Sequence, residues 1–138
     1  DFNHSSKFNL ITCLWNVLGH YPNKASRINL FHKINHLLDK GGVFIFDVNN
    51  RYNISQYGYK NVEKNLKNDR LHMEDSGWFT LGKESNKTRV YAHSPFDIEE
   101  YLLKTDLLLE NTMYIDYNTG IVKDTFLEGQ LLYKLRKS

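Results

Sequence analysis

Polar side chains that are able to contact a ligand follow two apolar runs in this sequence. Asn16 and His20 come directly after the run from Phe8 to Trp15, and Asp47 lies at the end of a second run that starts at Val43. Such runs are typical of strands buried in a parallel sheet, and sheets of that type bind ligands at the carboxyl ends of their strands. We therefore expect these polar residues to line a binding site.

The first candidate group consists of Cys13, Asn16 and His20. Their position at the end of a strand, more than their residue types, makes them candidates for contact with a bound molecule. The competing interpretation is that Asn16 caps a turn and His20 packs within a loop. Cys13 has no charged sequence neighbour and no Cys-x-x-Cys partner, so we expect a core thiol and not a nucleophile.

The second candidate group consists of Asp47, Asn49, Asn50 and Tyr52. A carboxylate at the end of a strand could orient an amine or hydroxyl of a substrate, and Tyr52 could close over it. The competing interpretation, slightly favoured for Asp47 alone, is that this carboxylate satisfies backbone amides of the Asn-rich turn.

Two other patterns indicate weaker hypotheses. His32 and His36 have the i, i+4 spacing of zinc ligands, but no third ligand is evident, so a solvated helix flank is the better interpretation. The basic tail residues Lys134, Arg136 and Lys137, together with many tyrosines, could suggest a nucleic-acid surface. A net charge of +2 and aromatic residues at strand spacing argue against that surface.

The elements that would position the candidate groups form a strand, helix, strand unit. Residues 8–15 predict a central strand, and a helix after Pro22 and Asn23 carries an apolar stripe that is stopped by Gly41 and Gly42. Residues 43–48 predict a second buried strand beside the first. The apolar stripe of the helix comprises Ile28, Phe31, Ile34, Leu37 and Leu38.

The remaining chain predicts one polar excursion, a hairpin, a helix and a final strand pair. Residues 55–75 suggest a mobile excursion or a poorly defined helix, and residues 78–81 and 88–93 predict a hairpin. Ser94, Pro95 and Asp97 predict a capped helix start. We expect its apolar face at Phe96, Tyr101, Leu102 and Leu103, followed by antiparallel strands over 107–117 and 130–136.

Taken together, these segments resemble the class I, Rossmann-like, S-adenosylmethionine-dependent methyltransferases. Residues 8–20 resemble the fourth strand of that family and its following loop, and Leu37 to Asp47 resemble its leucine-leucine-x-x-glycine-glycine entry into the fifth strand. Residues 94–103 and the final hairpin are similar to its last helix and strands six and seven. The resemblance implies an α/β fold with parallel strands four and five, crossover helices and an antiparallel terminal hairpin. Among the four strands, it places the last between the second and the third.

The sequence departs from this family where the cofactor loop belongs. No Gly-x-Gly loop occurs in the chain, and no acidic residue matches the one that ends strand two of the family. We expect residues 1–138 to be the C-terminal half of a methyltransferase domain, with residues 55–93 as an insertion on the substrate side. The missing half is expected in the parent polypeptide or in a partner, and the Phe8–Trp15 edge could alternatively pair with a second copy.

The resemblance implies S-adenosylmethionine-dependent methyl transfer by the complete domain, to a small-molecule or macromolecular acceptor. It assigns Cys13, Asn16 and His20 to the cofactor and the group from Asp47 to Tyr52 to the substrate. The alternative is a non-catalytic, methyltransferase-like module that pairs with a partner. A single cysteine favours a reducing, cytoplasmic compartment, and no apolar stretch approaches the ~20 residues of a membrane span.

Overall fold

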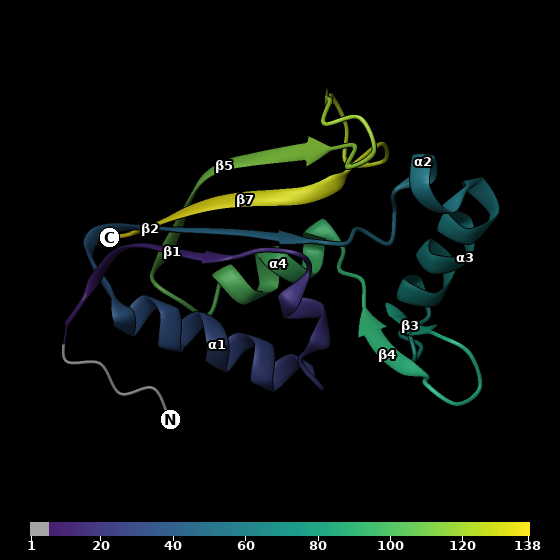
Figure 1. Cartoon of the computed structure of the whole chain (residues 1–138), viewed down its shortest axis with the longest axis horizontal. Helices are drawn as coiled ribbons and strands as arrows, with labels where there is room; N and C mark the ends of the chain where they lie inside the picture. Colours follow the sequence, from purple (N-terminus) through teal and green to yellow (C-terminus); the bar gives the residue numbers. More distant parts are fainter. Residues whose placement is uncertain (1–5) are drawn as a thin grey trace.

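A computed structural model of the chain describes residues 6–138, and its main feature is a five-stranded sheet with two helices on one face (Figure 1). Along the sheet the order is β1-β2-β7-β5-β6. The strands are β1 (Phe8–Cys13), β2 (Leu38–Val48), β5 (Leu107–Ile115), β6 (Val122–Lys123) and β7 (Gln130–Lys137). The predicted α/β fold and the predicted strand order are therefore confirmed.

The predicted strand, helix, strand unit is present. β1 pairs in parallel with β2, so that Ile11 lies opposite Phe44 and Cys13 opposite Phe46. The helix α1 (Lys24–Leu37) crosses between the two strands and starts at Asn23, whose side chain accepts a hydrogen bond from the Ser26 N–H in a capping box. Both strands thus end on the same edge of the sheet, as a ligand site at their carboxyl ends requires.

The core lies between the sheet and the helices α1 and α4 (Pro95–Leu102). The ring of Phe31 meets the edges of Phe44 and Phe46 at centroid distances of 5.8 and 5.3 Å. Phe46 also stacks on Tyr133 of β7 at 5.1 Å. These buried aromatic contacts confirm that Phe31 packs on one face of the two predicted strands.

The helix α1 ends earlier than the sequence pattern predicts. It stops at Leu37, and β2 begins at Leu38, so Gly41 and Gly42 lie inside the strand and do not terminate the helix. Leu38 is fully buried, which holds it in the core instead of in a last helical turn. A Cβ atom on Gly42 would lie 2.9 Å from the Phe8 carbonyl oxygen, so this glycine permits the close approach of β1.

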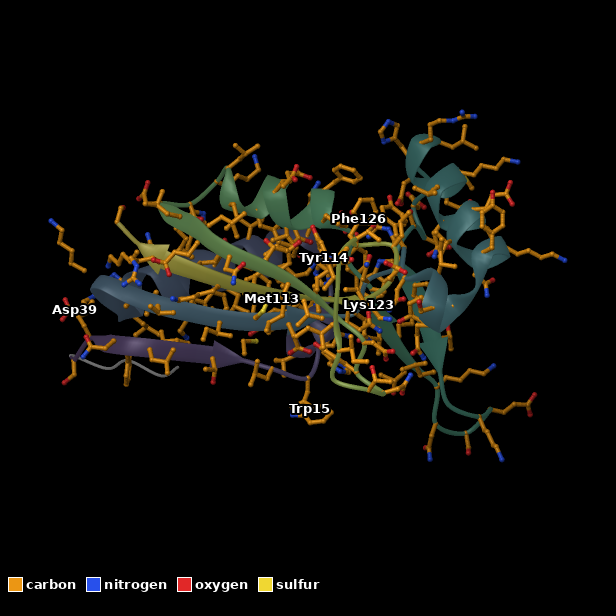
Figure 2. All side chains as sticks on the ribbon, turned by 90° about the horizontal axis from the view of Figure 1, so that it is seen from above. Trp15, Asp39, Met113, Tyr114, Lys123 and Phe126 are labelled. Carbon is orange, nitrogen blue, oxygen red and sulfur yellow. The ribbon has the colours of Figure 1, made fainter. Side chains whose placement is uncertain are left out.

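The first strand is not buried on both faces within residues 6–138, as the central strand of a complete sheet would be, but forms the long apolar edge that is expected when the other half of the domain is missing. Within residues 6–138, β1 is the outermost strand on its side of the sheet. Leu10 is 54% exposed, and Leu14 lies beyond the end of the strand with Trp15, which projects from this edge (Figure 2). An apolar edge of this kind is available for pairing with another strand.

Residues 54–91 form a separate layer beyond the carboxyl ends of β1 and β2, shown at the right of Figure 1. They contain the helices α2 (Ile54–Tyr57) and α3 (Tyr59–Arg70) and the hairpin strands β3 (Trp78–Leu81) and β4 (Thr88–Tyr91). The hairpin is confirmed. Of the two alternatives for residues 55–75, a mobile excursion or a poorly defined helix, the structure shows helix, in the two segments α2 and α3, and Val62 of α3 is buried.

The helix α4 starts as predicted, and two members of its predicted apolar face, Tyr101 and Leu102, pack in or against the core. Ser94 and Asp97 form a capping box at its first turn. Ile98 and Tyr101 are buried, whereas Phe96 is 59% and Leu103 is 87% exposed, because Leu103 lies beyond the last helical residue. None of the helices in the described part of the chain combines the length and apolarity that crossing a bilayer requires.

Candidate functional site

The loop after β1 brings the first candidate group to the end of β2. Asn16 is buried and has a left-handed backbone, with φ of 53°. Its side-chain oxygen makes no capping bond to the short helix η1 (Val17–His20) and accepts instead from the Asn49 N–H at 3.0 Å. The predicted neighbours Asn16 and Asn49 therefore join the carboxyl ends of the two parallel strands.

The tight geometry of this loop depends on Gly19. A Cβ atom there would lie 2.4 Å from the Asn16 side-chain nitrogen and 2.5 Å from the Tyr91 carbonyl oxygen. Such a contact would force the loop and the hairpin apart, so glycine is required at this position. The close packing at Gly19 fixes the backbone position of His20, the next residue in the chain.

His20 is exposed and lines a cavity of about 520 Å³ between η1 and the hairpin. The other lining residues are Pro22, Glu74, Asp75, Trp78 and Arg89. The structure therefore separates His20 from Asp47, which lies in a different cavity. An exposed imidazole in a polar cavity can donate or accept a hydrogen bond with a bound molecule.

Cys13 is half-buried at the end of β1 and packs against the core. Burial, together with the negative charge of Asp47, raises the pKa of the Cys13 thiol above its ordinary value. The protonated thiol is a small apolar group and a poor nucleophile. This agrees with the predicted core thiol and leaves only a packing contact for Cys13 in the cofactor neighbourhood.

Asp47 lies in a cavity of about 340 Å³ that is also lined by Leu14, Trp15, Tyr117 and Leu132. The carboxylate is 4% exposed, and its Oδ2 atom accepts a hydrogen bond from the Tyr117 hydroxyl. Tyr117 lies in the turn between β5 and β6, 70 positions away in the sequence. The tyrosine hydroxyl that contacts Asp47 is therefore that of Tyr117. Tyr52, which was expected to close over this site, does not supply it.

Asn50 is fully buried, and its side chain joins the end of β2 to the segment before β7. Its Nδ2 atom donates to the carbonyl oxygens of Phe126 and Gly129, and its Oδ1 atom accepts from the Tyr52 N–H at 3.1 Å. All of its hydrogen-bonding groups are therefore used within the protein. These contacts make Asn50 a positioning residue for the chain around Asp47.

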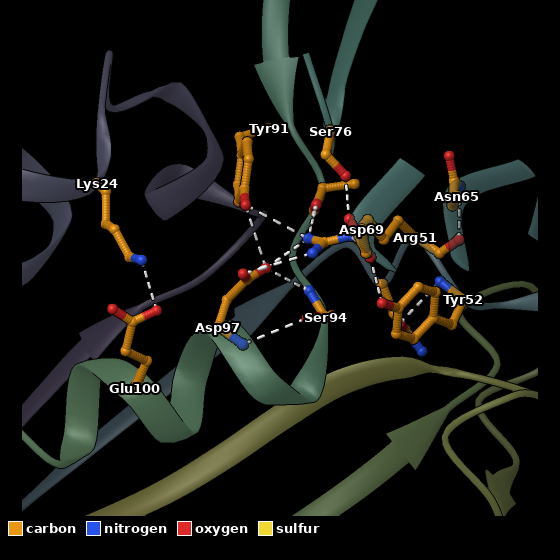
Figure 3. Close-up of polar contacts among 12 residues, drawn as sticks. Lys24, Arg51, Tyr52, Asn65, Asp69, Ser76, Tyr91, Ser94, Asp97 and Glu100 are labelled. Atoms are coloured by element: carbon orange, nitrogen blue, oxygen red, sulfur yellow. Dashed lines mark hydrogen bonds and ion pairs between the residues drawn. The ribbon is translucent and has the colours of Figure 1, made fainter. Parts of the chain in front are cut away.

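Arg51 lies at the centre of a buried ionic cluster that fastens the residue 54–91 layer to α4 (Figure 3). Its guanidinium contacts the carboxylates of Asp69 and Asp97, and it donates to the Ala92 carbonyl oxygen at 3.0 Å. The Tyr52 hydroxyl also donates to Asp69. We refer to Arg51, Asp69 and Asp97 as the arginine cluster.

His93 is packed beside the arginine cluster and is completely buried. Its ring meets Tyr91 and Tyr101 edge-on at 4.8 and 5.9 Å, and neither of its nitrogens has a hydrogen-bond partner. Burial, followed by the positive charges of Arg27 and Arg51, lowers the pKa of His93 well below its ordinary value. The imidazole is therefore neutral at physiological pH.

Tyr117, Asp69 and Asp97 are partners of the candidate residues that no sequence pattern indicates. Asp97 was recognised only as part of a helix cap, and no local pattern pairs Tyr117 with Asp47. His32 and His36 are exposed on α1, as the solvated-flank interpretation predicts. Within residues 6–138, no three His, Cys, Asp or Glu side chains are grouped to hold a metal ion.

Comparison with known proteins gives structural matches without sequence matches. No protein-family model matches the chain, and a search of curated proteins finds no similar sequence. An S-adenosylmethionine-dependent methyltransferase from Clostridium acetobutylicum superposes with a TM-score of 0.65 and 20% identity, covering 100% of this chain and 61% of that protein.

Two further solved structures superpose equally well. An S-adenosylmethionine-dependent methyltransferase from Methanosarcina mazei gives a TM-score of 0.68 at 13% identity, with 97% of this chain and 61% of that one covered. The CcbJ methyltransferase from Streptomyces caelestis gives 0.66 at 11% identity, with coverages of 100% and 64%. The chain thus has the Rossmann-like fold of the S-adenosylmethionine-dependent methyltransferases and spans about three fifths of the length of these structures.

Proposed function

We propose that this chain forms the acceptor-side part of an S-adenosylmethionine-dependent methyltransferase domain. The observation that carries the proposal is the convergence of the loop after β1 and the end of β2, through the Asn16 to Asn49 hydrogen bond, in a fold shared with such enzymes. Ligands of open α/β sheets bind at this edge. Residues 54–91 lie beyond the same edge, which supports their proposed role as a substrate-side insertion.

The residues of this chain fit one wall of a cofactor site. The loop from Cys13 to His20 is held rigidly by the buried Asn16 and by the close packing at Gly19. The chain has neither a glycine-rich loop that would contact the carboxypropyl end of S-adenosylmethionine nor an acidic residue at the position that would bind its ribose. We therefore propose that Cys13, Asn16 and His20 border the cofactor, and that the other walls come from a segment that is absent from this sequence.

Methyl transfer needs positioning and desolvation more than covalent help from the protein. The bound cofactor would supply an electrophilic methyl group on its sulfonium. We propose that Asp47 and Asn49 orient the acceptor, and that Asn50, Tyr52 and the arginine cluster hold these two residues in place. The acceptor is a small molecule or a macromolecule.

Titration calorimetry with S-adenosylmethionine tests this proposal. The 138-residue chain should show no submillimolar affinity, since one wall cannot offset the several kcal/mol of lost translational and rotational freedom. A longer chain that includes any glycine-rich segment encoded upstream should bind. In that longer chain, Asn16→Ala and His20→Ala should weaken binding or turnover, whereas His32→Ala on the exposed flank of α1 is the matched control.

Two results would contradict the proposal. Submillimolar binding by the 138-residue chain would mean that its cofactor site is built differently, for example across a dimer of β1 edges. Absence of binding by the longer chain would favour a non-catalytic module that uses the β1 edge to pair with a partner.

A further inference from the structure

The cavity beside Asp47 lies on the face of the sheet that α1 and α4 do not cover. Phe46 and Val48 point into the core, as do their cross-strand partners on β7. Because strand side chains alternate between faces, Asp47 and its partner Leu132 point to the opposite side. The cavity is therefore open to a ligand without any movement of the core.

Only one of the two oxygens of the Asp47 carboxylate has a partner. Oδ2 accepts from the Tyr117 hydroxyl, whereas Oδ1 is buried without a hydrogen-bond partner among the described residues. A buried polar atom without a partner destabilises a folded protein, and such atoms are rare in native structures. Oδ1 is therefore a buried acceptor without a partner in a residue that lines the cavity.

The charge of Asp47 is likewise not balanced by a nearby cation. No Lys or Arg of the described residues forms an ion pair with it, and the neighbouring Arg51 is already paired with Asp69 and Asp97. Burial, followed by the hydrogen bond to Asp47, raises the pKa of Tyr117, so this hydroxyl stays protonated and acts as a donor. Among the described residues, the Asp47 carboxylate thus has a neutral hydrogen-bond donor, the Tyr117 hydroxyl, but no positively charged donor.

The other walls of the cavity are apolar. Leu14 and Leu132 line it, together with Trp15, whose side chain is 86% exposed and whose backbone is left-handed at φ 67° (Figure 2). A non-glycine residue in this conformation is strained, and an indole that is left in water gains no burial energy. Both features are explained if the Trp15 ring covers an apolar ligand.

We propose that this cavity binds a small molecule in which an amine is attached to a flat apolar body. The amine donates to Asp47 Oδ1 and neutralises the carboxylate, while the apolar body packs between Trp15 and Leu132. The inference rests on the proposed function only where it identifies the bound amine as the methyl acceptor. The amine-binding site itself does not depend on the cofactor.

Nuclear magnetic resonance with three matched probes tests the proposal on the 138-residue chain. Benzylamine carries an ammonium, benzyl alcohol a neutral donor and toluene no donor, on the same ring. We expect each to shift the Trp15 indole signal and to leave that of Trp78, the other tryptophan, unchanged. Benzylamine should bind about tenfold or more tighter than benzyl alcohol, as a charge-assisted hydrogen bond implies.

Variants locate the recognition at Asp47. Asp47→Asn should reduce the preference for benzylamine to within about twofold, whereas Asp75→Asn, at a carboxylate whose side chain is 88% exposed, should leave it unchanged. Tyr117→Phe should keep or increase the preference, because it removes the competing donor and leaves the carboxylate. A loss of preference in Tyr117→Phe would overturn the proposal by making the tyrosine the recognised group.

Other outcomes separate this inference from the proposed function. Equal affinities for benzylamine and benzyl alcohol in the unaltered chain, or shifts at Trp78 instead of Trp15, would overturn the amine site and leave methyl transfer intact. Competition between benzylamine and S-adenosylhomocysteine in a cofactor-binding longer chain would overturn the assignment to the acceptor, because the cofactor would then fill the cavity. Lack of cofactor binding alone would leave the amine site standing.

Discussion

The buried Asp47 and the part-buried pair Asp69 and Asp97 differ in how many of their carboxylate oxygens accept hydrogen bonds within the protein. In the arginine cluster all four carboxylate oxygens of Asp69 and Asp97 accept hydrogen bonds, from Arg51, Tyr52, Ser76, Tyr91 and Ser94. At Asp47, four residues before Arg51, one of the two oxygens has no partner within residues 6–138, and no Lys or Arg of that range forms an ion pair with it. The two groups lie at the same edge of the sheet, but only the arginine cluster has all of its carboxylate oxygens hydrogen-bonded.

This difference distinguishes residues that stabilise the fold from a residue that is able to bind a ligand. An ionic cluster in which every carboxylate oxygen already accepts a hydrogen bond holds the elements that carry it in a fixed geometry. A buried acceptor without a partner weakens the free protein and is stabilised when a donor binds. The arginine cluster is therefore the brace of the site, and Asp47 is the part with binding capacity.

The largest expected effect is loss of the brace. Arg51→Met should destabilise the chain by ~3–5 kcal/mol, because it leaves the part-buried carboxylates of Asp69 and Asp97 without their cation. Urea unfolding followed by circular dichroism measures this. Arg89→Met breaks an ion pair whose side chains are 57% and 88% exposed, and it should change stability by no more than about 1 kcal/mol. Similar effects of both substitutions would refute the distinction.

The pH dependence of stability should reveal His93, which packs against the brace. Its folded pKa lies well below the ordinary value of 6.5, so below that pH the unfolded chain binds a proton that the folded chain rejects. Stability should therefore fall as the pH drops below 6.5, by up to about 1.4 kcal/mol per pH unit.

His93→Leu should flatten this part of the profile, and leucine fits because neither imidazole nitrogen has a hydrogen bond to lose. His32→Leu, on the exposed flank of α1, controls for the loss of an imidazole. Thermal unfolding between pH 5 and 7, chosen as roughly the range in which histidine titrates, gives the slope. An unchanged slope in His93→Leu would show that the folded protein accepts the proton.

A smaller effect is expected at the helix cap that orients Asp97 toward Arg51. Ser94→Ala removes the hydroxyl that accepts from the Asp97 N–H at 3.2 Å, and it should reduce stability by ~1 kcal/mol. Ser94→Thr retains a capping oxygen and should recover most of the loss. Equilibrium unfolding of both variants compares them, and equal losses would mean that the hydroxyl contributes nothing to the cap.

The smallest effect on stability is expected at Asp47. Asp47→Asn keeps an acceptor for Tyr117 and removes an unpaired buried charge, so stability should change by less than about 1 kcal/mol or increase. Asp97→Asn, the same substitution within the brace, should be clearly more harmful because Arg51 loses its anion. If Asp47→Asn were the more destabilising of the two, Asp47 would be a structural residue and not a binding group.

Much of the fold could be predicted from local patterns. The apolar runs around Leu10 and Phe44, the cap at Ser94 and the final strands each carry a signal within a few residues. Errors arose where local and long-range forces compete. Gly41 and Gly42 look like a helix stop, but burial of Leu38 starts the strand earlier. The segment 55–75 lacks a strong apolar stripe, and its helices rest on tertiary contacts such as those of Asp69.

The sequence by itself determined which residues stand at the carboxyl ends of the two parallel strands, because alternation, capping and turn chemistry act between near neighbours. Asn16, His20, Asp47 and Asn49 were found on that basis, and Asn16 and Asn49 do meet. Only the tertiary structure decided that Tyr117 contacts Asp47 across 70 positions, and that Arg51 collects Asp69 and Asp97. Such pairings depend on the order of the strands in the sheet and on how the connecting turns pack, and local sequence periodicity does not specify either.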